Sequence, residues 1–195
     1  MKDVARQRLL DALVAITAER GLDRASMREV AAAAGVAIGT VQYYCRSKDE
    51  MLRMAFEYVI DRIIARVTAI PESDRAAHML RHGVLEFLPL DELRRVEARV
   101  YLAFTARAAI SPPLARLQHD LQTQMREKCT RAFALARQRG EAVADFDPEA
   151  AARATMAMVD GLMLHMLTDP AGMPADAAIT VLDEHLHRFL NLEPI

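Results

Sequence analysis

Between residues 37 and 48 the chain carries side chains suited to contact with a nucleic acid. Four of them are small or can form hydrogen bonds, as a helix needs in order to approach base edges in a DNA major groove: Ala37, Gly39, Thr40 and Gln42. Three neighbours can hold phosphates and so fix the register of such a helix: Tyr43, Tyr44 and Lys48. Lys48 stands in the first turn of an expected helix, where the helix dipole disfavours a cation, so we expect an external anion to meet it.

Three short helices are expected to position these side chains. Ser26 and Glu29 form a capping box, which predicts the start of a short helix. Gly35 fits the turn that follows, because glycine tolerates a positive φ, and a second short helix is expected over residues 37–44. A second capping box at residues 47–50 opens a long helix toward Ile70. These proportions are typical of a helix-turn-helix.

The remainder of the chain also reads as helical. Gly and Pro together number 15 in 195 residues, Trp is absent, and apolar residues recur at spacings of three and four. We count nine expected helices and no alternating strand pattern, which predicts an all-α protein. The two last helices are expected over residues 147–168 and 175–190. The first of them is rich in Ala, Gly and Met around nearly its whole circumference, so it needs a second packing surface.

Charge and cysteine content limit the class of protein. The net charge is −2, but residues 1–50 carry a net charge of +1, the sign expected of a surface that binds phosphates. The two cysteines, Cys45 and Cys129, stand 84 positions apart, which excludes a disulfide framework or a thiol metal knuckle. The N-terminus lacks the pattern of a signal peptide, and the longest apolar segment, residues 154–167, is shorter than the ~20 residues of a bilayer span. We therefore expect a cytoplasmic protein without membrane contact.

No catalytic or metal-binding constellation is evident. His78 and His82 are spaced to share one helical face, but two ligands do not make a metal site, and we expect an exposed or interface pair. The sequence offers no nucleophile with its base, no paired carboxylates and no phosphate loop, so we expect neither enzyme activity nor a cofactor. The alternative is a helical small-molecule carrier or enzyme whose first three helices do not bind DNA.

Residues 26–52, SMREVAAAAGVAIGTVQYYCRSKDEML, resemble the DNA-binding signature of TetR-family transcriptional regulators. Eleven residues stand at matching places without a gap: Val30, Ala31, Ala34, Gly35, Val36, Gly39, Thr40, Tyr44, Ser47, Lys48 and Leu52. The chain departs from the pattern at Ala37, where Ser is common, at Gln42, where Tyr is usual, and at Cys45, where Phe is usual.

The resemblance implies a helix-turn-helix head over residues 1–48 and an effector-binding and dimerisation body over residues 49–195. It implies DNA contacts by Ser26, Arg28, Ala37, Ile38, Gly39, Thr40, Gln42, Tyr43, Tyr44 and Lys48. It also implies a homodimer on a palindromic operator, with the last two helices at the dimer interface. The implied function is a repressor released from DNA by a small molecule.

Met and aromatic residues of the body suit an apolar or amphipathic effector, because thioethers adapt in shape and aromatic faces attract cations. The expected effector-binding residues are Phe87, Tyr101, Phe104, Thr105, Leu121, Met125, Met156 and Met163. Most such residues in a helical body simply form its core, so both roles stay open at this point.

Overall fold

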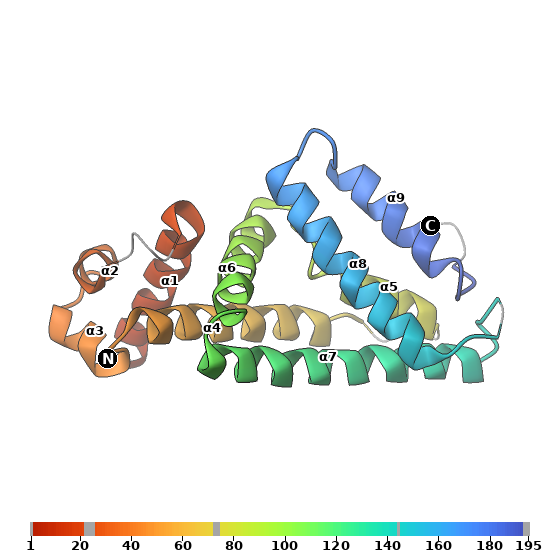
Figure 1. Ribbon diagram of the computed structural model, residues 1–195, viewed down its shortest axis with the longest axis horizontal. Coiled ribbons are helices and arrows are strands. Elements are labelled where there is room, and N and C mark those ends of the chain that lie inside the picture. The colour runs from red at the N-terminus through yellow and green to blue at the C-terminus, as the bar shows by residue number, and fades with distance from the viewer. Residues whose placement is uncertain (1, 22–25, 72–74, 144, 193–195) are drawn as a thin grey trace. The chain divides into compact units, whose positions relative to one another are not determined.

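The computed structural model describes residues 2–21, 26–71, 75–143 and 145–192 (Figure 1). These residues form nine helices: α1 (Lys2–Arg20), α2 (Met27–Ala34), α3 (Ile38–Tyr44), α4 (Lys48–Thr68), α5 (Ala76–Leu85), α6 (Glu92–Ala108), α7 (Pro112–Gln138), α8 (Pro148–Thr168) and α9 (Ala175–Leu186). In the same residues the only β-type pairing is an isolated bridge between Ala142 and Leu190. The predicted all-α fold is confirmed.

The chain forms two compact units. Unit 1 comprises Met1–Ile64 and Arg95–Gln118, and unit 2 comprises Ala65–Arg94 and His119–Ile195. Three helices, α4, α6 and α7, therefore contribute residues to both units.

Unit 1 has a core of aliphatic side chains from the first three helices and of aromatic side chains from α4 and α6. Leu9, Val30 and Val41 have no exposed surface. The Phe56 ring of α4 stacks on the Phe104 ring of α6, with centroids 3.7 Å apart and planes 8° from parallel. Because both rings are also buried, this stack fixes α4 against α6 within the unit.

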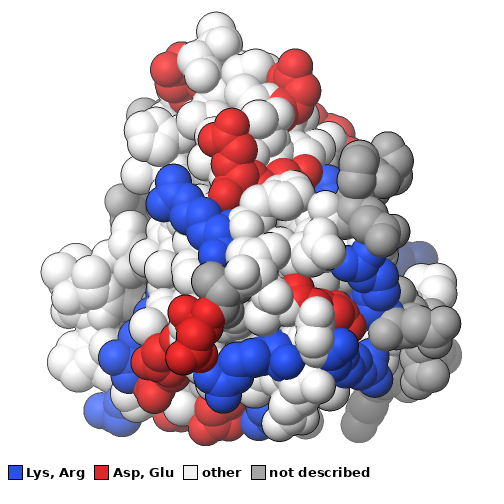
Figure 2. Space-filling view, turned by 90° about the vertical axis from the view of Figure 1, so that its right-hand side faces the viewer, with Lys and Arg blue, Asp and Glu red and all other residues white. Residues whose placement is uncertain are grey.

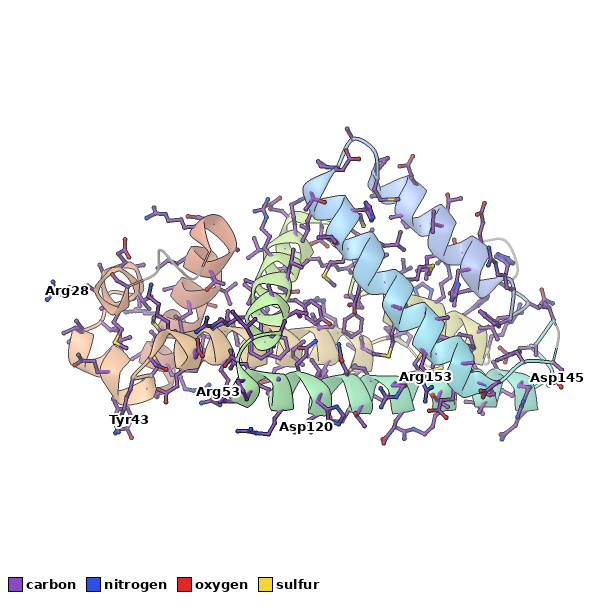
Figure 3. All side chains as sticks on the ribbon, viewed as in Figure 1. Arg28, Tyr43, Arg53, Asp120, Asp145 and Arg153 are labelled. Carbon is purple, nitrogen blue, oxygen red and sulfur yellow. The ribbon has the colours of Figure 1, made fainter. Side chains whose placement is uncertain are left out.

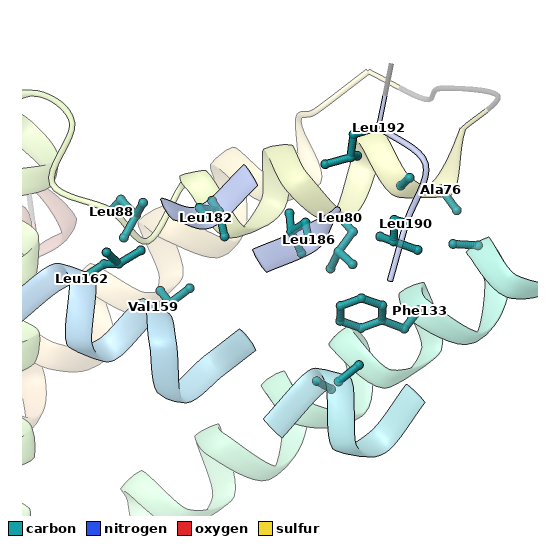
Figure 4. Packing of buried hydrophobic residues seen from close by; sticks show 14 of the residues in the cluster. Ala76, Leu80, Leu88, Phe133, Val159, Leu162, Leu182, Leu186, Leu190 and Leu192 are labelled. Carbon is teal, nitrogen blue, oxygen red and sulfur yellow. The ribbon is translucent and has the colours of Figure 1, made fainter. Parts of the chain in front are cut away.

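Unit 2 buries its core among α5, α7, α8 and α9 (Figure 4). Leu182 and Leu186 of α9 have no exposed surface, and their spacing of four residues puts them on one side of the helix. Phe133 of α7 lies edge-on to Phe146 and Phe189, at centroid distances of 5.7 and 5.6 Å. The amphipathic spacing seen in the sequence thus corresponds to an observed core.

A carboxylate from a distant part of the chain caps α5. The N-cap residue, Arg75, makes no side-chain capping bond. Instead, Glu141 accepts hydrogen bonds from the backbone N–H groups of Ala76 (3.0 Å) and Ala77 (2.8 Å), and its side chain is only 9% exposed. The negative charge also faces the positive end of the α5 dipole.

Removing this cap should lower stability. Glu141→Ala leaves two buried backbone donors unpaired, so we expect the free energy of unfolding to fall by about 3 kcal/mol. Thermal or urea unfolding measures the change. Glu127, whose side chain is 60% exposed, provides the matched control, and Glu127→Ala should cost less than about 0.5 kcal/mol. Equal losses in both variants would contradict a capping role for Glu141.

Candidate nucleic-acid interface

The capping box predicted at Ser26 starts α2. The Ser26 hydroxyl accepts a hydrogen bond from the Glu29 N–H (3.2 Å), and the Ser26 N–H donates to the Glu29 carboxylate (2.9 Å). The hydroxyl also donates to that carboxylate at 2.8 Å. Together these hydrogen bonds hold the pKa of Glu29 below its usual value. The Ser26 side chain, although exposed, is thus engaged within the head.

Gly35 makes the turn between α2 and α3. Its φ of 63° and ψ of 36° lie in the left-handed region, as predicted, and its N–H bonds to Ala32 O (3.2 Å). Ala37 then adopts extended backbone (φ −68°, ψ 146°), so α3 begins at Ile38, one residue later than predicted. Alanine cannot accept a capping bond, and accordingly α3 has no side-chain cap.

α3 has one buried and one exposed side. Val41 and Cys45 are completely buried, and the Cys45 thiol donates to Val41 O at 3.3 Å. Two other side chains are accessible: Ile38 is 40% and Tyr43 76% exposed, large values for such residues. Figure 3 shows Tyr43 of α3 and Arg28 of α2 extending away from the ribbon of the head.

The predicted DNA-contacting residues are all at least partly accessible. Exposed are Ser26, Arg28, Ala37, Ile38, Gly39, Gln42, Tyr43 and Lys48. Half-buried are Thr40 and Tyr44, and the Tyr44 ring is edge-on to that of Tyr43 at 5.1 Å. Unit 1 therefore presents α3 with much of its surface exposed, as the predicted DNA contacts require.

Lys48 is the first residue of α4 and comes four positions after the end of α3. The Ser47 hydroxyl accepts from the Glu50 N–H at 3.1 Å, and Glu50 reaches back to the Arg46 N–H. The predicted helix start is confirmed, and this capping holds Lys48 at a fixed place in the first turn.

The cysteines take no part in this surface. Burial raises the pKa of the Cys45 thiol to about 11 and that of Cys129 to about 12, so both remain protonated and unreactive. In the part of the chain that the structure describes, no three His, Cys, Asp or Glu side chains gather as a metal site requires.

Positive and negative side chains are mixed on the face of the molecule that Figure 2 shows. On the face seen in Figure 2, Lys and Arg alternate with Asp and Glu and do not gather into one positive patch. Among its described side chains, that face therefore lacks the single-sign charge expected of a phosphate-binding surface.

Comparison with known proteins decides the family. The pattern of the family described as bacterial regulatory proteins, tetR family, matches residues 9–55. The pattern described as BetI-type transcriptional repressor, C-terminal, matches residues 76–191, which is more than half of the chain. The chain belongs to the TetR family of transcriptional regulators. Its function as a DNA-binding transcriptional regulator follows.

Individual relatives agree with this membership of the TetR family. The crystal structure of a transcriptional regulator from Rhodococcus sp. Rha1 is 34% identical, covers 97% of this chain and 99% of its own, and superposes with a TM-score of 0.84. The regulator PksA of Bacillus subtilis (strain 168) is 28% identical over 93% of this chain and 87% of its own. The regulator BetI 2 of Chromohalobacter salexigens is 27% identical over 97% and 90%. Each of these relatives is named as a transcriptional regulator.

None of the helices that the structure describes is long and apolar enough to span a membrane. The choline complex of a regulator from Saccharomonospora viridis shares the fold, with a TM-score of 0.83 at 24% identity, over 95% of this chain and 97% of its own.

The expected effector-binding residues divide between the two units. Unit 1 holds Tyr101, Phe104 and Thr105, and unit 2 holds Phe87, Leu121, Met125, Met156 and Met163. Phe104 has no exposed surface and stacks on Phe56, so a substitution there perturbs the core of unit 1. Met163 is also buried, and the other six are half-buried.

Gln118 is a polar residue that the sequence analysis missed. Its side chain is 93% buried, as its 7% exposure shows, and its amide nitrogen lies 3.4 Å from the Tyr101 hydroxyl. Gln118 Oε1 and Thr105 Oγ1 are buried with no hydrogen-bond partner among the described residues. Unit 1 thus holds a buried polar contact between α6 and α7, and Thr105 lies one helical turn along α6 from Tyr101. Nothing in the periodicity of α7 distinguished Gln118 from an ordinary surface glutamine.

Asp49 is a second residue without a signal in the sequence. One carboxylate oxygen accepts from Arg107 Nε of α6 at 3.0 Å, and the other accepts from the Ser111 hydroxyl at 3.2 Å. Ser111 lies directly before α7, where the sequence predicts the start of a helix. The first turn of α4, beside Lys48, is therefore bonded to the end of α6 and the start of α7 within unit 1.

Removing the Lys48 charge should weaken binding to all DNA alike. One fewer counterion is released, so Lys48→Ala should reduce the slope of log affinity against log salt by about one. Changing Thr40 or Gln42 should instead shift sequence preference. Fluorescence anisotropy over a salt series measures both effects. An unchanged affinity and slope for Lys48→Ala would show that this lysine does not contact the DNA backbone.

Gly39 offers a test that separates DNA contact from folding. A Cβ atom built at Gly39 meets nothing within 4 Å, and its φ is not positive, so alanine fits the protein. Gly39→Ala should stabilise α3 by up to about 1 kcal/mol. The added methyl lies on the exposed side and should lower specific DNA affinity about tenfold, the worth of one base contact. Unchanged affinity would mean that the backbone at Gly39 does not approach the DNA closely.

Proposed function

We propose that this regulator is a homodimeric repressor that binds a palindromic operator and is released by a small apolar or amphipathic molecule. Residues 1–48 form the DNA-binding head, and residues 49–195 form the effector-binding and dimerisation body. This functional division differs from the two compact units, because α4 as far as Ile64 packs in unit 1.

The observation that carries the DNA-binding half of this proposal is the exposed side of α3, which carries Gln42 and Tyr43 and is followed by exposed Lys48 at the start of α4. A single short helix buries too little surface for tight specific binding. Two heads held in one dimer gain the second contact at high effective concentration, which favours an operator with two matching half-sites.

The outward sides of α8 and α9 support dimerisation. Each helix places apolar residues in the core of unit 2, yet each also keeps apolar residues exposed, among them Ala157, Leu164 and Val181. Gly161 lies on the same side of α8 as Ala157 and Leu164, at spacings of four and three, and a Cβ atom there meets nothing within 4 Å. Small and aliphatic residues at helical spacing allow the close approach of a second copy.

The effector is expected to carry an uncharged hydrogen-bonding group. Thr105 Oγ1 and Gln118 Oε1 are buried without partners among the described residues, and leaving such groups unpaired is costly. The nearby carboxylate of Glu97 is 1% exposed and is paired with Arg62 at 3.1 Å, so its charge is already balanced. A polar but uncharged group beside Tyr101 would satisfy these atoms at little cost.

The test starts from the DNA beside the protein's own gene. Purified protein should retard a fragment of that region and protect two symmetric half-sites in footprinting, and the Gln42→Ala, Lys48→Ala double variant should not. Mass spectrometry of small molecules released from the purified protein identifies the candidate effector, which should abolish the retardation. Protection of a single half-site by a monomer, or retention of the complex at saturating effector, would contradict the proposal.

A further inference from the structure

α3 has no charged side chain with which to read bases. Of its seven residues, all of them described, the exposed ones are Ile38, Gly39, Gln42 and Tyr43. The commonest specific contact in the major groove is an Arg or Lys bound to guanine O6 and N7. α3 cannot make this contact, and it offers an aliphatic group and a primary amide instead.

Ile38 and Gln42 lie on the same side of α3. They are four positions apart, which places their Cβ atoms about 6 Å from each other along one face of the helix. Val41, which lies between them in the sequence, has no exposed surface and packs α3 against the rest of the head. Ile38 and Gln42 are both exposed beside this buried residue, so both side chains reach the surface of the head, with exposed Gly39 between them in the sequence.

We propose that α3 reads two A·T base pairs in each half-site of the operator. The Gln42 amide donates to N7 of an adenine and accepts from its N6 amino group, the paired contact that fits adenine and no other base. Ile38 packs on the C5 methyl group of a thymine, which guanine and cytosine lack. Because about 6 Å spans roughly two steps of ~3.4 Å along a strand, the two pairs lie one or two steps apart. This inference rests on the proposed function, namely operator binding through α3.

Base analogues test each contact by one atom or one methyl group. Selection from random-sequence duplexes with the full-length protein gives the operator, in which the two pairs should be A·T. Replacing the thymine by uracil removes the methyl group, and replacing the adenine by 7-deazaadenine removes the N7 acceptor. Each change should lower the affinity of the unaltered protein about fivefold or more.

Two variants assign the contacts to their side chains. Ile38→Ala should become insensitive to uracil and stay sensitive to 7-deazaadenine, whereas Gln42→Ala should show the reverse, so each variant is the control for the other. Both positions are exposed, and circular dichroism verifies that the variants fold.

The outcomes separate this inference from the function on which it rests. If selection enriches no common site, operator binding fails and the base assignment fails with it. If a site is enriched but carries G·C pairs under α3, or if neither analogue changes the affinity of the unaltered protein, only the base assignment is overturned. The analogue measurements on the unaltered protein remain decisive even if a variant does not fold.

Discussion

Gly161→Glu should split the homodimer and lower the affinity for the full operator by about 100-fold or more. The site has open space within the chain, so glutamate fits the protomer, but two copies of α8 would bring buried like charges together. Loss of the partner removes the second head, and with it the gain in affinity of about 100- to 10,000-fold that linked binding provides. Ala157→Glu, one helical turn away, should act in the same way.

Sedimentation velocity and operator titration measure the two losses on the same samples. Gln124→Glu adds the same charge at an exposed position of α7 and should leave both assembly and affinity unchanged. Thermal unfolding verifies that the separated protomer is folded. A Gly161→Glu protein that remains dimeric, or a folded monomer that binds the full operator as tightly as before, would show that α8 does not form the functional interface.

The second large effect concerns the bond between α4 and the α6–α7 connection. Replacing Arg107 by Gln together with Ser111 by Ala removes both groups that bond to the Asp49 carboxylate. Asp49 itself, one residue after Lys48, is left intact. We expect affinity for operator without effector to stay within about threefold, because this exposed pair contributes little energy. In the unaltered protein we expect effector to lower operator affinity by a factor of about 5 to 150. In the double variant this factor should fall toward one.

The control for these two substitutions is an arginine elsewhere on α6, the helix that carries Arg107. Arg99 is exposed on α6, and Arg99→Gln removes one positive charge without touching Asp49. It should keep normal release by effector. If effector released the operator from the double variant as readily as from the unaltered protein, the bonds of Asp49 to Arg107 and Ser111 would have no part in coupling the two sites.

The head was predictable from the sequence because its determinants are local. Ser26 with Glu29, Gly35, and Ser47 with Glu50 are signals that act over three or four residues, and the structure confirms each of them. The helix-turn-helix could therefore be placed to within one residue at α3. Helical spacing also places Ile38 and Gln42 as neighbours on α3, whereas the exposure of both is known only from the structure.

Contacts between distant residues were not predictable. Asp49 meets Arg107 across 58 positions, and Glu141 meets Ala77 across 64, and neither partner differs in type or spacing from ordinary surface residues. Phe104 shows a different difficulty, because its residue type and spacing fit two roles. An aromatic residue on a helical face can line a ligand site or fill a core, and the sequence does not show that its ring is buried in a stack on Phe56.

Affinity for the effector, measured with and without saturating operator, tests the inducible repressor most directly. The effector is the molecule identified by mass spectrometry of the purified protein, and calorimetry gives its dissociation constant in both states. Because coupling between two sites is reciprocal, operator DNA must weaken effector binding by the same factor by which effector weakens operator binding, about 5- to 150-fold. Equal dissociation constants in the presence and absence of operator would mean that the two sites are uncoupled, and the proposed release by effector would be wrong.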